Sequence, residues 1–429
     1  MKIRQLSVLA RELIPGSNGL LSKRAEMFAP EVWPEFFDRA EGIVVTDIEG
    51  NNYRDFANFS VGTCTLGYQH PDVDQAVIDV IRKGTMSTLN PPEEVYLAQK
   101  LVKMHPWSAM VRFARTGGEA NAISVRIARA FTNKSKIAFC GYHGWHDWYL
   151  SANLKDKSNL DQQLMSGLSP RGVPNDLAGT SKPFSASDLE ALEAILKQGD
   201  IAAVKMEVMR SHEPTIEYLL AVKDLAKRYG ALLIFDECTS GFRETFGGLH
   251  LKYGVSPDLC VLGKTVGNGY PLTAVVGTKE VMMASQDSFI SSTFFTERVG
   301  FVAALKTLEV MESVRSWDQI TALGKYFRKK ITDTFQKNGY VIDITGLSAL
   351  TTYVIEHPNY SLIKTYLTQE MLKEGYLMSG QFYPSIAHTR DDIDHFCSAL
   401  MGVLSRIPDP LTPESLQGPI CHTGFERLN

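Results

Sequence analysis

The sequence lacks the paired cysteines that mark zinc-binding or disulfide-bonded domains. Its six cysteines are scattered along 429 residues, and no two of them form a Cys-x-x-Cys pair. This scatter disfavours a disulfide framework or a zinc ribbon and favours a reducing compartment, so we expect a cytoplasmic protein. Arg11 and Glu12 interrupt the region after the first basic residues, so a secretory signal is not expected.

A strong net charge and long apolar runs are also missing. The formal net charge of −4 provides no positive field for nucleic acid or for an anionic membrane. No apolar run approaches the ~20 residues that a membrane-spanning helix requires. Hydrophobic residues make up 44% of the chain and charged residues 21%, which is typical of a globular enzyme with one very large domain or two to three ordinary ones.

The middle of the sequence alternates short apolar runs with helical patterns. The expected strands lie at 136–140, 202–208, 231–236, 259–262 and 274–277. A helical pattern at 219–229 ends before Gly230, a natural residue after a helix. Strands joined by helices predict a mainly parallel sheet buried on both faces. Ligands of such sheets bind beyond the carboxyl ends of the strands.

The two ends of the chain follow other patterns. Gly50 and Asn51 separate the β-rich stretches 43–47 and 52–56, which predicts a hairpin. Four segments are therefore expected: residues 1–65 join a small domain, 66–300 form a large domain, 301–406 form a small α+β domain, and 407–429 form an irregular, proline-rich tail.

Two polar residues follow buried strands at the expected carboxyl edge. Asp236 ends one apolar run, and Lys264 follows another at the start of the glycine-rich turn 263–271. A buried carboxylate needs a cationic partner, and glycines let another group approach closely. Pyridoxal 5'-phosphate needs such a pair, an amine for its aldehyde and a carboxylate for its pyridine nitrogen. A salt-bridged structural acid and a solvated lysine are the alternatives.

A phosphate site is suggested at the start of the next predicted helix. Gly117 and Gly118 follow Thr116 there. Free N–H groups and the helix dipole at such a start favour an anion. An ordinary helix cap would give the same pattern.

An aromatic and histidine-rich segment follows the strand at 136–140. Tyr142 can stack on a flat cofactor ring. His143, His146 and Asp147 are also conceivable metal ligands. However, His-x-x-His is poor spacing for one helix face, and the sequence offers no third ligand cluster. Structural packing is the remaining interpretation.

Together these segments resemble the class III pyridoxal-phosphate-dependent aminotransferases of fold type I, and most closely glutamate-1-semialdehyde 2,1-aminomutase and its relatives. The resemblance runs from about residue 30 to residue 400. The segments that carry it are 115–120 (Arg-Thr-Gly-Gly-Glu-Ala), 142–144 (Tyr-His-Gly), 235–237 (Phe-Asp-Glu), 240–243 (Ser-Gly-Phe-Arg), 256–258 (Ser-Pro-Asp) and 262–264 (Leu-Gly-Lys). It implies an α/β fold: a large domain with a mainly parallel sheet between helices, and a smaller α+β domain built from the N- and C-terminal parts.

The resemblance also implies roles for single residues. Lys264 forms a Schiff base with pyridoxal 5'-phosphate, Asp236 pairs with the pyridine nitrogen, and Tyr142 stacks on the ring. Thr293 resembles the threonine that reaches the phosphate of the neighbouring subunit, which implies a homodimer with shared active sites. The other expected cofactor-binding residues are Thr116, Gly117, Gly118, His143 and Glu207.

The implied reaction moves an amino group from an amino-acid donor to an aldehyde or ketone acceptor. The donor displaces Lys264, whose freed amine acts as the general base between the substrate carbon and the cofactor carbon. Hydrolysis leaves pyridoxamine phosphate and a carbonyl product, and the reverse half-reaction aminates the acceptor. In an aminomutase, donor and acceptor are two positions of one molecule. A pyridoxal-phosphate-binding protein without turnover is a third reading, although no DNA-binding helix-turn-helix or basic tail is evident.

The residues expected to meet the substrate depart from the aminomutase pattern. Arg24 stands near the substrate-binding arginine of that family, but its Asn-Ser-Pro-Val-Arg motif is absent. Tyr383 replaces an acid, and the usual Glu-Pro-Val has become Glu-Val-Met before Arg210 and His212. These four residues are therefore candidate contacts to a different carbonyl substrate, by analogy a sugar or glycan precursor. Surface charge or packing would explain them equally well.

Overall fold

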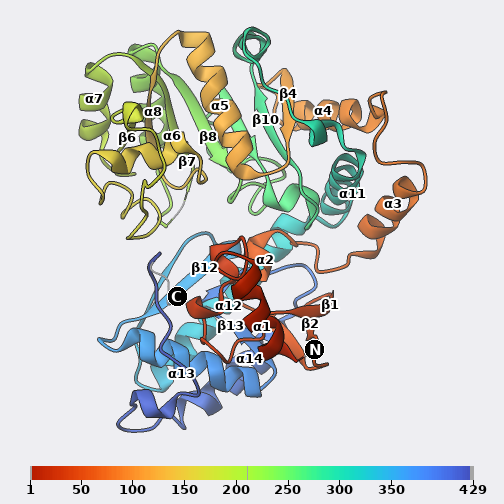
Figure 1. The fold of residues 1–429 in the computed structure, drawn as a ribbon, viewed down its shortest axis with the longest axis vertical. Helices are drawn as coiled ribbons and strands as arrows, with labels where there is room; N and C mark the ends of the chain where they lie inside the picture. The colour runs from red at the N-terminus through yellow and green to blue at the C-terminus, as the bar shows by residue number, and fades with distance from the viewer. Residues whose placement is uncertain (1, 210, 426–429) are drawn as a thin grey trace. The chain divides into compact units, whose positions relative to one another are not determined.

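The structure, a computed structural model, describes residues 2–209 and 211–425, which separate into two compact units (Figure 1). The large unit comprises residues 71–318, and the small unit combines residues 1–70 with 319–429. The sequence predicts boundaries after residues 65 and 300. The large unit extends to 318 because helix α11 (Arg298–Val314) packs on helix α3 (Pro71–Ile81).

Seven strands form the central sheet of the large unit, in the order β4-β10-β9-β8-β7-β5-β6. Their bounds are β4 Met110–Ala114, β5 Lys136–Cys140, β6 Ser181–Pro183, β7 Ile201–Glu207, β8 Leu232–Glu237, β9 Leu259–Leu262 and β10 Thr273–Gly277. Five neighbouring strands, from β9 to β6, pair in parallel, whereas β10 runs antiparallel to β9 and to β4. The mainly parallel sheet expected from the sequence is confirmed, with one reversed strand.

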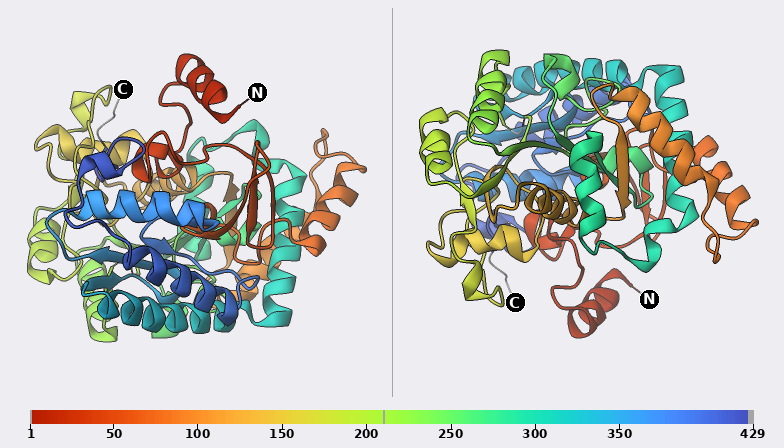
Figure 2. Two further views of the ribbon diagram at one scale, coloured as in Figure 1. Left: turned by 90° about the horizontal axis from the view of Figure 1, so that it is seen from below. Right: turned by 90° about the horizontal axis from the view of Figure 1, so that it is seen from above.

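Helices lie on both sides of this sheet (Figure 2). They are α4 Pro92–Met104, α5 Gly117–Thr132, α6 Asp147–Leu150, α7 Leu189–Lys197, α8 Ile216–Arg228, α9 His250–Tyr253 and α10 Lys279–Met283, besides α3 and α11. Helix α8 begins earlier than the hydrophobic pattern alone indicates, because the Thr215 hydroxyl accepts a hydrogen bond from the N–H of Tyr218. The described part of the chain contains no helix with the length and apolar character needed to cross a membrane.

The small unit joins the two ends of the chain through a shared sheet. Strands β1 to β3 form antiparallel pairs, and β3 then pairs in parallel with β13. The hairpin expected around Gly50 and Asn51 is confirmed by the pairing of β2 with β3. The elements are α1 Ile3–Leu13, β1 Phe37–Glu41, β2 Val44–Asp47, β3 Asn52–Phe56, α2 Phe59–Gly62, α12 Ser316–Lys337, β11 Ile342–Thr345, β12 Thr351–Ile355, α13 Tyr360–Lys373, β13 Tyr376–Met378, β14 Gln381–Phe382 and α14 Arg390–Leu404.

Aromatic rings fill the core of the small unit around Phe56. The ring of Phe56 stacks on Phe396 at 4.4 Å and on Phe382 at 5.1 Å between centroids. The buried imidazole of His388 meets Phe56 edge-on and donates from Nε2 to the carbonyl oxygen of Asp55 at 3.0 Å. This core therefore contains a histidine that is held in place by a backbone carbonyl.

Candidate functional site

The carboxyl edge of the central sheet brings together residues from distant parts of the sequence. Glu207 is the last residue of β7 and Asp236 the second-last residue of β8, and the two are register partners. Lys264 follows β9, and His143 follows β5. Parallel strands end at the same edge, so these side chains share one region of the large unit. This is the grouping that the sequence predicts for the cofactor.

Asp236 is buried and closely paired with His143. Its Oδ2 lies 2.8 Å from Nδ1 of His143, and its Oδ1 accepts the N–H of Cys238 at 3.0 Å. Burial alone would raise the pKa of Asp236, but the hydrogen bond from His143 and the charge of Lys205 hold this pKa well below its ordinary value. Nε2 of His143 must carry a hydrogen, because it faces the carbonyl oxygen of Cys140 at 3.0 Å. Asp236 is thus an ionised acceptor that His143 holds in position.

Lys264 is half-buried and lies in an uncommon backbone conformation. Its φ of 46° is in the left-handed region, which non-glycine residues seldom occupy away from functional sites. Its Nζ donates to the Thr239 hydroxyl at 2.7 Å. Burial lowers the pKa of the Lys264 amine, although the neighbouring Cys238 partly opposes this effect. A lysine with a lowered pKa supplies more of the neutral amine that attacks a carbonyl.

The start of α5 is capped and closely covered by the loop after β5. Thr116 and Glu119 form a reciprocal capping box, with Oε2 of Glu119 2.9 Å from the N–H of Thr116. The loop crosses the helix start so closely that a Cβ atom on Gly144 would lie 2.8 Å from Cα of Gly118. Nδ1 of His146 is buried beside Gly118 and has no hydrogen-bond partner among the described residues. The helix start therefore has polar groups available for an anion.

Glu207 supports the segment that contains Tyr142. Its Oε2 accepts the backbone N–H of Tyr142 at 3.0 Å. The Tyr142 side chain itself is 37% exposed, and its ring meets Tyr149 edge-on. Tyr142 is thus partly exposed, while its backbone is held by Glu207.

Two residues near this edge were not anticipated from the sequence. Thr239 receives the hydrogen bond from Lys264, and Lys205 is fully buried within β7. The signal for Lys205 was a lysine inside an otherwise apolar strand, which normally excludes an unpaired charge. Thr239 gives no comparable signal, because a threonine in a loop is common.

Of the conceivable metal ligands of this region, His143 is engaged in hydrogen bonds at both ring nitrogens, with Asp236 and with Cys140. A second cluster of Glu237, His250 and Cys260 is buried. There, Oε1 of Glu237 faces Nδ1 of His250 at 2.9 Å, and Nε2 of His250 accepts from Trp107 at 2.9 Å. This cluster is a satisfied hydrogen-bond network inside the large unit.

The candidate substrate residues fall into different parts of the chain. His212 is exposed and, with Glu207, lines a cavity of about 450 Å³ in the large unit. Arg210 lies outside the described residues. Tyr383 belongs to the small unit, where its hydroxyl accepts from Nε2 of Gln381 at 3.1 Å and its ring packs on a cluster that contains Phe59. Packing thus accounts for much of the environment of Tyr383.

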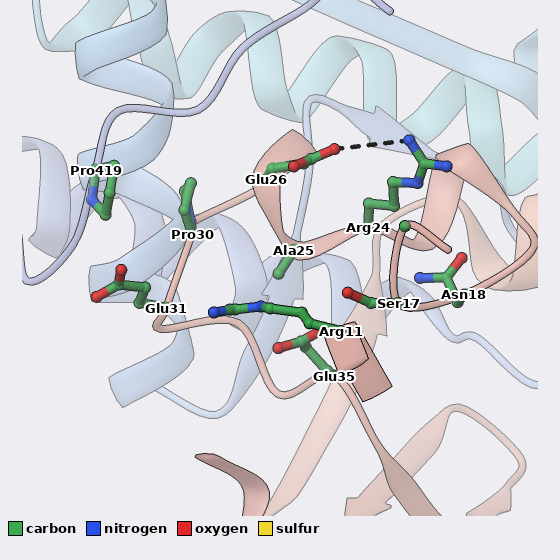
Figure 3. A pocket seen from close by; sticks show the side chains of 11 residues that line it. Arg11, Ser17, Asn18, Arg24, Ala25, Glu26, Pro30, Glu31, Glu35 and Pro419 are labelled. Carbon is green, nitrogen blue, oxygen red and sulfur yellow. Dashed lines mark ion pairs between the residues drawn. The ribbon is translucent and has the colours of Figure 1, made fainter. Parts of the chain in front are cut away.

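Arg24 lines a cavity of about 280 Å³ in the small unit (Figure 3). Its guanidinium lies 3.8 Å from Oε1 of Glu26, and Arg11 reaches into the same cavity from α1. Glu31 and Glu35 add negative charge to the wall. Arg24 therefore lies in a cavity that is lined by both basic and acidic side chains.

Thr293 is exposed on a short 3₁₀ helix, Thr293–Thr296, that is fixed to the large unit. The guanidinium of Arg115 donates to the carbonyl oxygens of Phe294 at 2.6 Å and Phe295 at 3.3 Å. The Thr293 side chain is therefore exposed on a backbone that Arg115 holds in place.

Comparison with known proteins decides the family of this chain. The sequence model described as "Aminotransferase class-III" matches residues 28–404. The chain belongs to the class III aminotransferases. It is 33% identical to the 3-aminobutyryl-CoA aminotransferase of Cloacimonas acidaminovorans over 413 residues, 93% of this chain and 95% of that protein. It is also 33% identical to the glutamate-1-semialdehyde 2,1-aminomutase of Methanothrix thermoacetophila over 356 residues, 81% of this chain and 80% of that protein.

A solved structure agrees on the fold. The FumI protein of Sphingopyxis sp. MTA144, solved in its PLP internal aldimine form, matches with a TM-score of 0.86 and 24% identity. The match covers 97% of this chain and 98% of that one. The fold type I architecture expected from the sequence is thereby confirmed, and this class III aminotransferase is a pyridoxal-phosphate-dependent enzyme.

The residues at the carboxyl edge fit pyridoxal 5'-phosphate, the cofactor of this aminotransferase. The amine of Lys264 suits an aldehyde, the ionised carboxylate of Asp236 suits a protonated ring nitrogen, and the start of α5 suits a phosphate. The unpartnered Nδ1 of His146 lies beside that helix start. The side chains and the helix start therefore suit three separate groups of the cofactor: its aldehyde, its ring nitrogen and its phosphate.

Proposed function

We propose that this enzyme transfers an amino group from an amino-acid donor to a small aldehyde or ketone acceptor, with Lys264 as its reactive amine. The observation that carries the proposal is the placement of Lys264 after β9, one strand from the ionised Asp236 at the end of β8. Bound pyridoxal 5'-phosphate supplies the electron-withdrawing ring that makes the substrate carbon acidic.

The proposed roles of the side chains follow from their contacts. Lys264 accepts and returns the substrate proton, because its amine has a lowered pKa and is oriented by Thr239. Asp236, supported by His143, accepts a hydrogen bond from the ring nitrogen and keeps it protonated. Tyr142 covers one face of the ring, and its backbone is held by Glu207.

The phosphate is proposed to bind where α5 begins. Thr116, Gly117 and Gly118 present the first backbone groups of that helix. Its dipole and free N–H groups favour a dianion at this position. The cofactor would thus be held at its aldehyde, its ring nitrogen and its phosphate by elements of one unit.

We propose a narrower range of substrates than the sequence alone indicates. The names of the two relatives at 33% identity refer to an aminoacyl-CoA and to glutamate semialdehyde. Neither name supports a sugar or glycan precursor as the acceptor. An acceptor with a carboxyl or thioester group near the carbonyl agrees better with these relatives.

A two-step screen tests the proposed function. Amino donors are offered first, and loss of the visible band of the bound cofactor is followed; carbonyl acceptors are then offered to restore it. The Lys264→Ala variant is the matched control and should show no catalytic cycling. Failure of every amino donor to change the band of the native enzyme would contradict the proposal.

An intramolecular reaction is the second candidate, because aminomutases from Methanothrix and from Heliobacterium modesticaldum are 33% and 31% identical to this chain. Incubation with glutamate-1-semialdehyde distinguishes the two readings. Formation of 5-aminolevulinate over many enzyme equivalents, without a second substrate, would establish the aminomutase. A single turnover that stops would favour the aminotransferase.

We also propose that the enzyme is a homodimer in which Thr293 reaches the phosphate bound by the partner. Exposed apolar side chains near it support this, since Phe289 is 85% and Phe294 60% exposed. Large exposed apolar side chains close together are typical of protein interfaces. Light scattering tests the stoichiometry directly, and a monomer at micromolar concentration that is fully active would contradict it.

A further inference from the structure

Lys205 is a fully buried lysine near the proposed cofactor site. It lies on β7 two residues before Glu207, which is the register partner of Asp236. Side chains alternate along a strand, so Lys205 and Glu207 point to the same face of the sheet. Its Nζ donates to the Ser124 hydroxyl on α5 at 3.1 Å, and Ser124 in turn donates to the carbonyl oxygen of Asn121 at 2.7 Å. Helix α5 therefore covers the lysine.

The ammonium of Lys205 has little direct compensation for its burial. Among the described residues its hydrogen-bond partner is the neutral Ser124, and no carboxylate there forms an ion pair with it. Burying such a charge costs stability, and an apolar side chain of similar size would be the more stable choice. The charge therefore acts mainly through space on the groups around it.

Lys205 is the register partner of Ile234, which lies two residues before Asp236 on the neighbouring strand β8. Four titratable groups influence the pKa of Lys205: Asp236 and Cys238 in and after β8, Cys260 on β9, and Glu207 on its own strand. Burial lowers the pKa of Lys205, and the charge of Asp236 is the first influence that opposes this. The hydrogen bond from His143 is the first influence that lowers the pKa of Asp236, and the charge of Lys205 is the next.

The effect of the Lys205 charge on a ligand of Asp236 depends on how far Lys205 lies from the carboxyl edge of the sheet. Asp236 is the second-last residue of β8 and is level with Glu207, the last residue of β7, whereas Lys205 lies two residues back from Glu207. A ligand beyond the strand ends is therefore farther from Lys205 than Asp236 is. A positive charge behind a carboxylate favours the state in which the shared proton stays on the ligand and not on the carboxylate.

We propose that Lys205 is a positioning residue that keeps Asp236 an ionised acceptor for the ring nitrogen of pyridoxal 5'-phosphate. The proposal rests on the cofactor and is independent of the substrate class. Lys205 acts through Asp236 and does not touch the cofactor.

Lys205→Met tests the proposal, because methionine approximates the length of lysine without its charge. We expect holoenzyme that releases its cofactor about tenfold faster on dilution, and a pH midpoint of its visible band that rises by about one unit. The melting temperature should stay the same or increase, because a buried charge has been removed. Lys136→Met is the control for net charge. Lys136 is the first residue of β5, away from the carboxyl edge of the sheet, so this variant should change neither cofactor release nor the midpoint of the visible band.

A double-variant experiment shows whether the effect runs through Asp236. In the Asp236→Asn background, Lys205→Met should add no further shift of the midpoint, since the carboxylate that it stabilises is gone. An equal shift in both backgrounds would overturn the proposal, as would a Lys205→Met holoenzyme with native cofactor release and a native midpoint. Should Lys205→Met fail to fold, Ser124→Ala decides: a smaller shift in the same direction supports the proposal, and none overturns it.

Discussion

Nδ1 of His143 lies 2.8 Å from Oδ2 of Asp236, although the two residues are 93 positions apart in the chain. Because Nε2 of His143 is committed to the Cys140 carbonyl, the ring cannot turn away. The carboxylate is therefore fixed both in position and in charge. Its remaining lone pairs are available to a ligand at the edge of the sheet.

Asp236→Asn should still bind the cofactor, although it should release it faster than the native enzyme, and should slow amino transfer by roughly 10²- to 10³-fold, the size expected when a positioned electrostatic partner is removed. An amide cannot stabilise a protonated ring nitrogen as a carboxylate does. Single-turnover kinetics with a saturating donor measure this step. The exposed Asp147→Asn in the same region is the control, and a native rate for Asp236→Asn would refute the assigned role.

Lys264→Ala should abolish covalent attachment of the cofactor and reduce amino transfer by at least about 10³-fold, because one side chain provides both the attachment and the general base. Borohydride treatment followed by peptide mass mapping should label Lys264 in the native enzyme only. Labelling of another lysine in the native enzyme would show that the reactive amine has been misassigned.

Gly144→Ala should weaken cofactor binding, because its new Cβ would collide with the backbone of Gly118 at the start of α5. Gly84→Ala is a matched control. Both glycines have positive φ, 99° and 93°, but a Cβ on Gly84 meets nothing within 4 Å. Each variant should lose about 1–3 kcal/mol of stability from backbone strain, and only Gly144→Ala should release the cofactor faster. Equal release rates for the two variants would exclude the collision as the cause.

Thr293→Ala should accelerate cofactor loss without changing the subunit stoichiometry, if the hydroxyl reaches a partner's phosphate. Thr296→Ala, on the same 3₁₀ helix, controls for local disruption. Repeated desalting with absorbance of the eluted protein measures retention. Native retention by a dimeric Thr293→Ala enzyme would remove Thr293 from the phosphate site.

Stability should fall as the pH decreases from about 6.5 to about 4, because two buried histidines are held neutral. Burial lowers the pKa of His388 and of His105 to about 4. Each offers one nitrogen as an acceptor, His388 to the N–H of Ser385 and His105 to that of Gly248. In this pH window the histidine of the unfolded chain binds a proton that the folded chain does not bind. At pH 4, each histidine therefore reduces the free energy of unfolding by roughly 3 kcal/mol.

Urea unfolding at several pH values checks this prediction. His388→Gln should flatten the pH dependence, whereas the exposed His395→Gln should leave its slope unchanged. An identical slope for native protein and His388→Gln would show that His388 is not held neutral in the fold.

The order of strands and helices in the large unit was predictable because local hydrophobic patterns determine it. The direction of β10 was not predictable, because strand direction depends on which neighbour a strand pairs with. The run Thr273–Gly277 is equally compatible with parallel and with antiparallel pairing. The start of α8 was set by the side chain of Thr215, a short-range contact that hydrophobic periodicity does not report.

The candidate site was predictable to the extent that each residue follows a strand. Asp236 and Lys264 carry that signal in the sequence. The partnership of His143 with Asp236, and the burial of Lys205 under Ser124, depend on contacts between distant segments. A single sequence does not contain those distances, so side chains that act through another residue are the ones that sequence reasoning misses.

The reversal of β10 has a consequence for how the reactive amine is held. The chain leaves the edge after Leu262 and re-enters it at Thr273, and the two strands are locked by the pairing of Val261 with Val275. Thr273 also ties the returning chain to the carbonyl oxygen of Thr116 at 3.2 Å. The register between β9 and β10 thus fixes the position of Lys264 relative to the sheet. Inserting a residue into the loop between Leu262 and Thr273, or deleting one from it, would therefore displace the amine of Lys264. A loop that leads to a crossover helix is not fixed by a neighbouring strand in this way and would tolerate such a change.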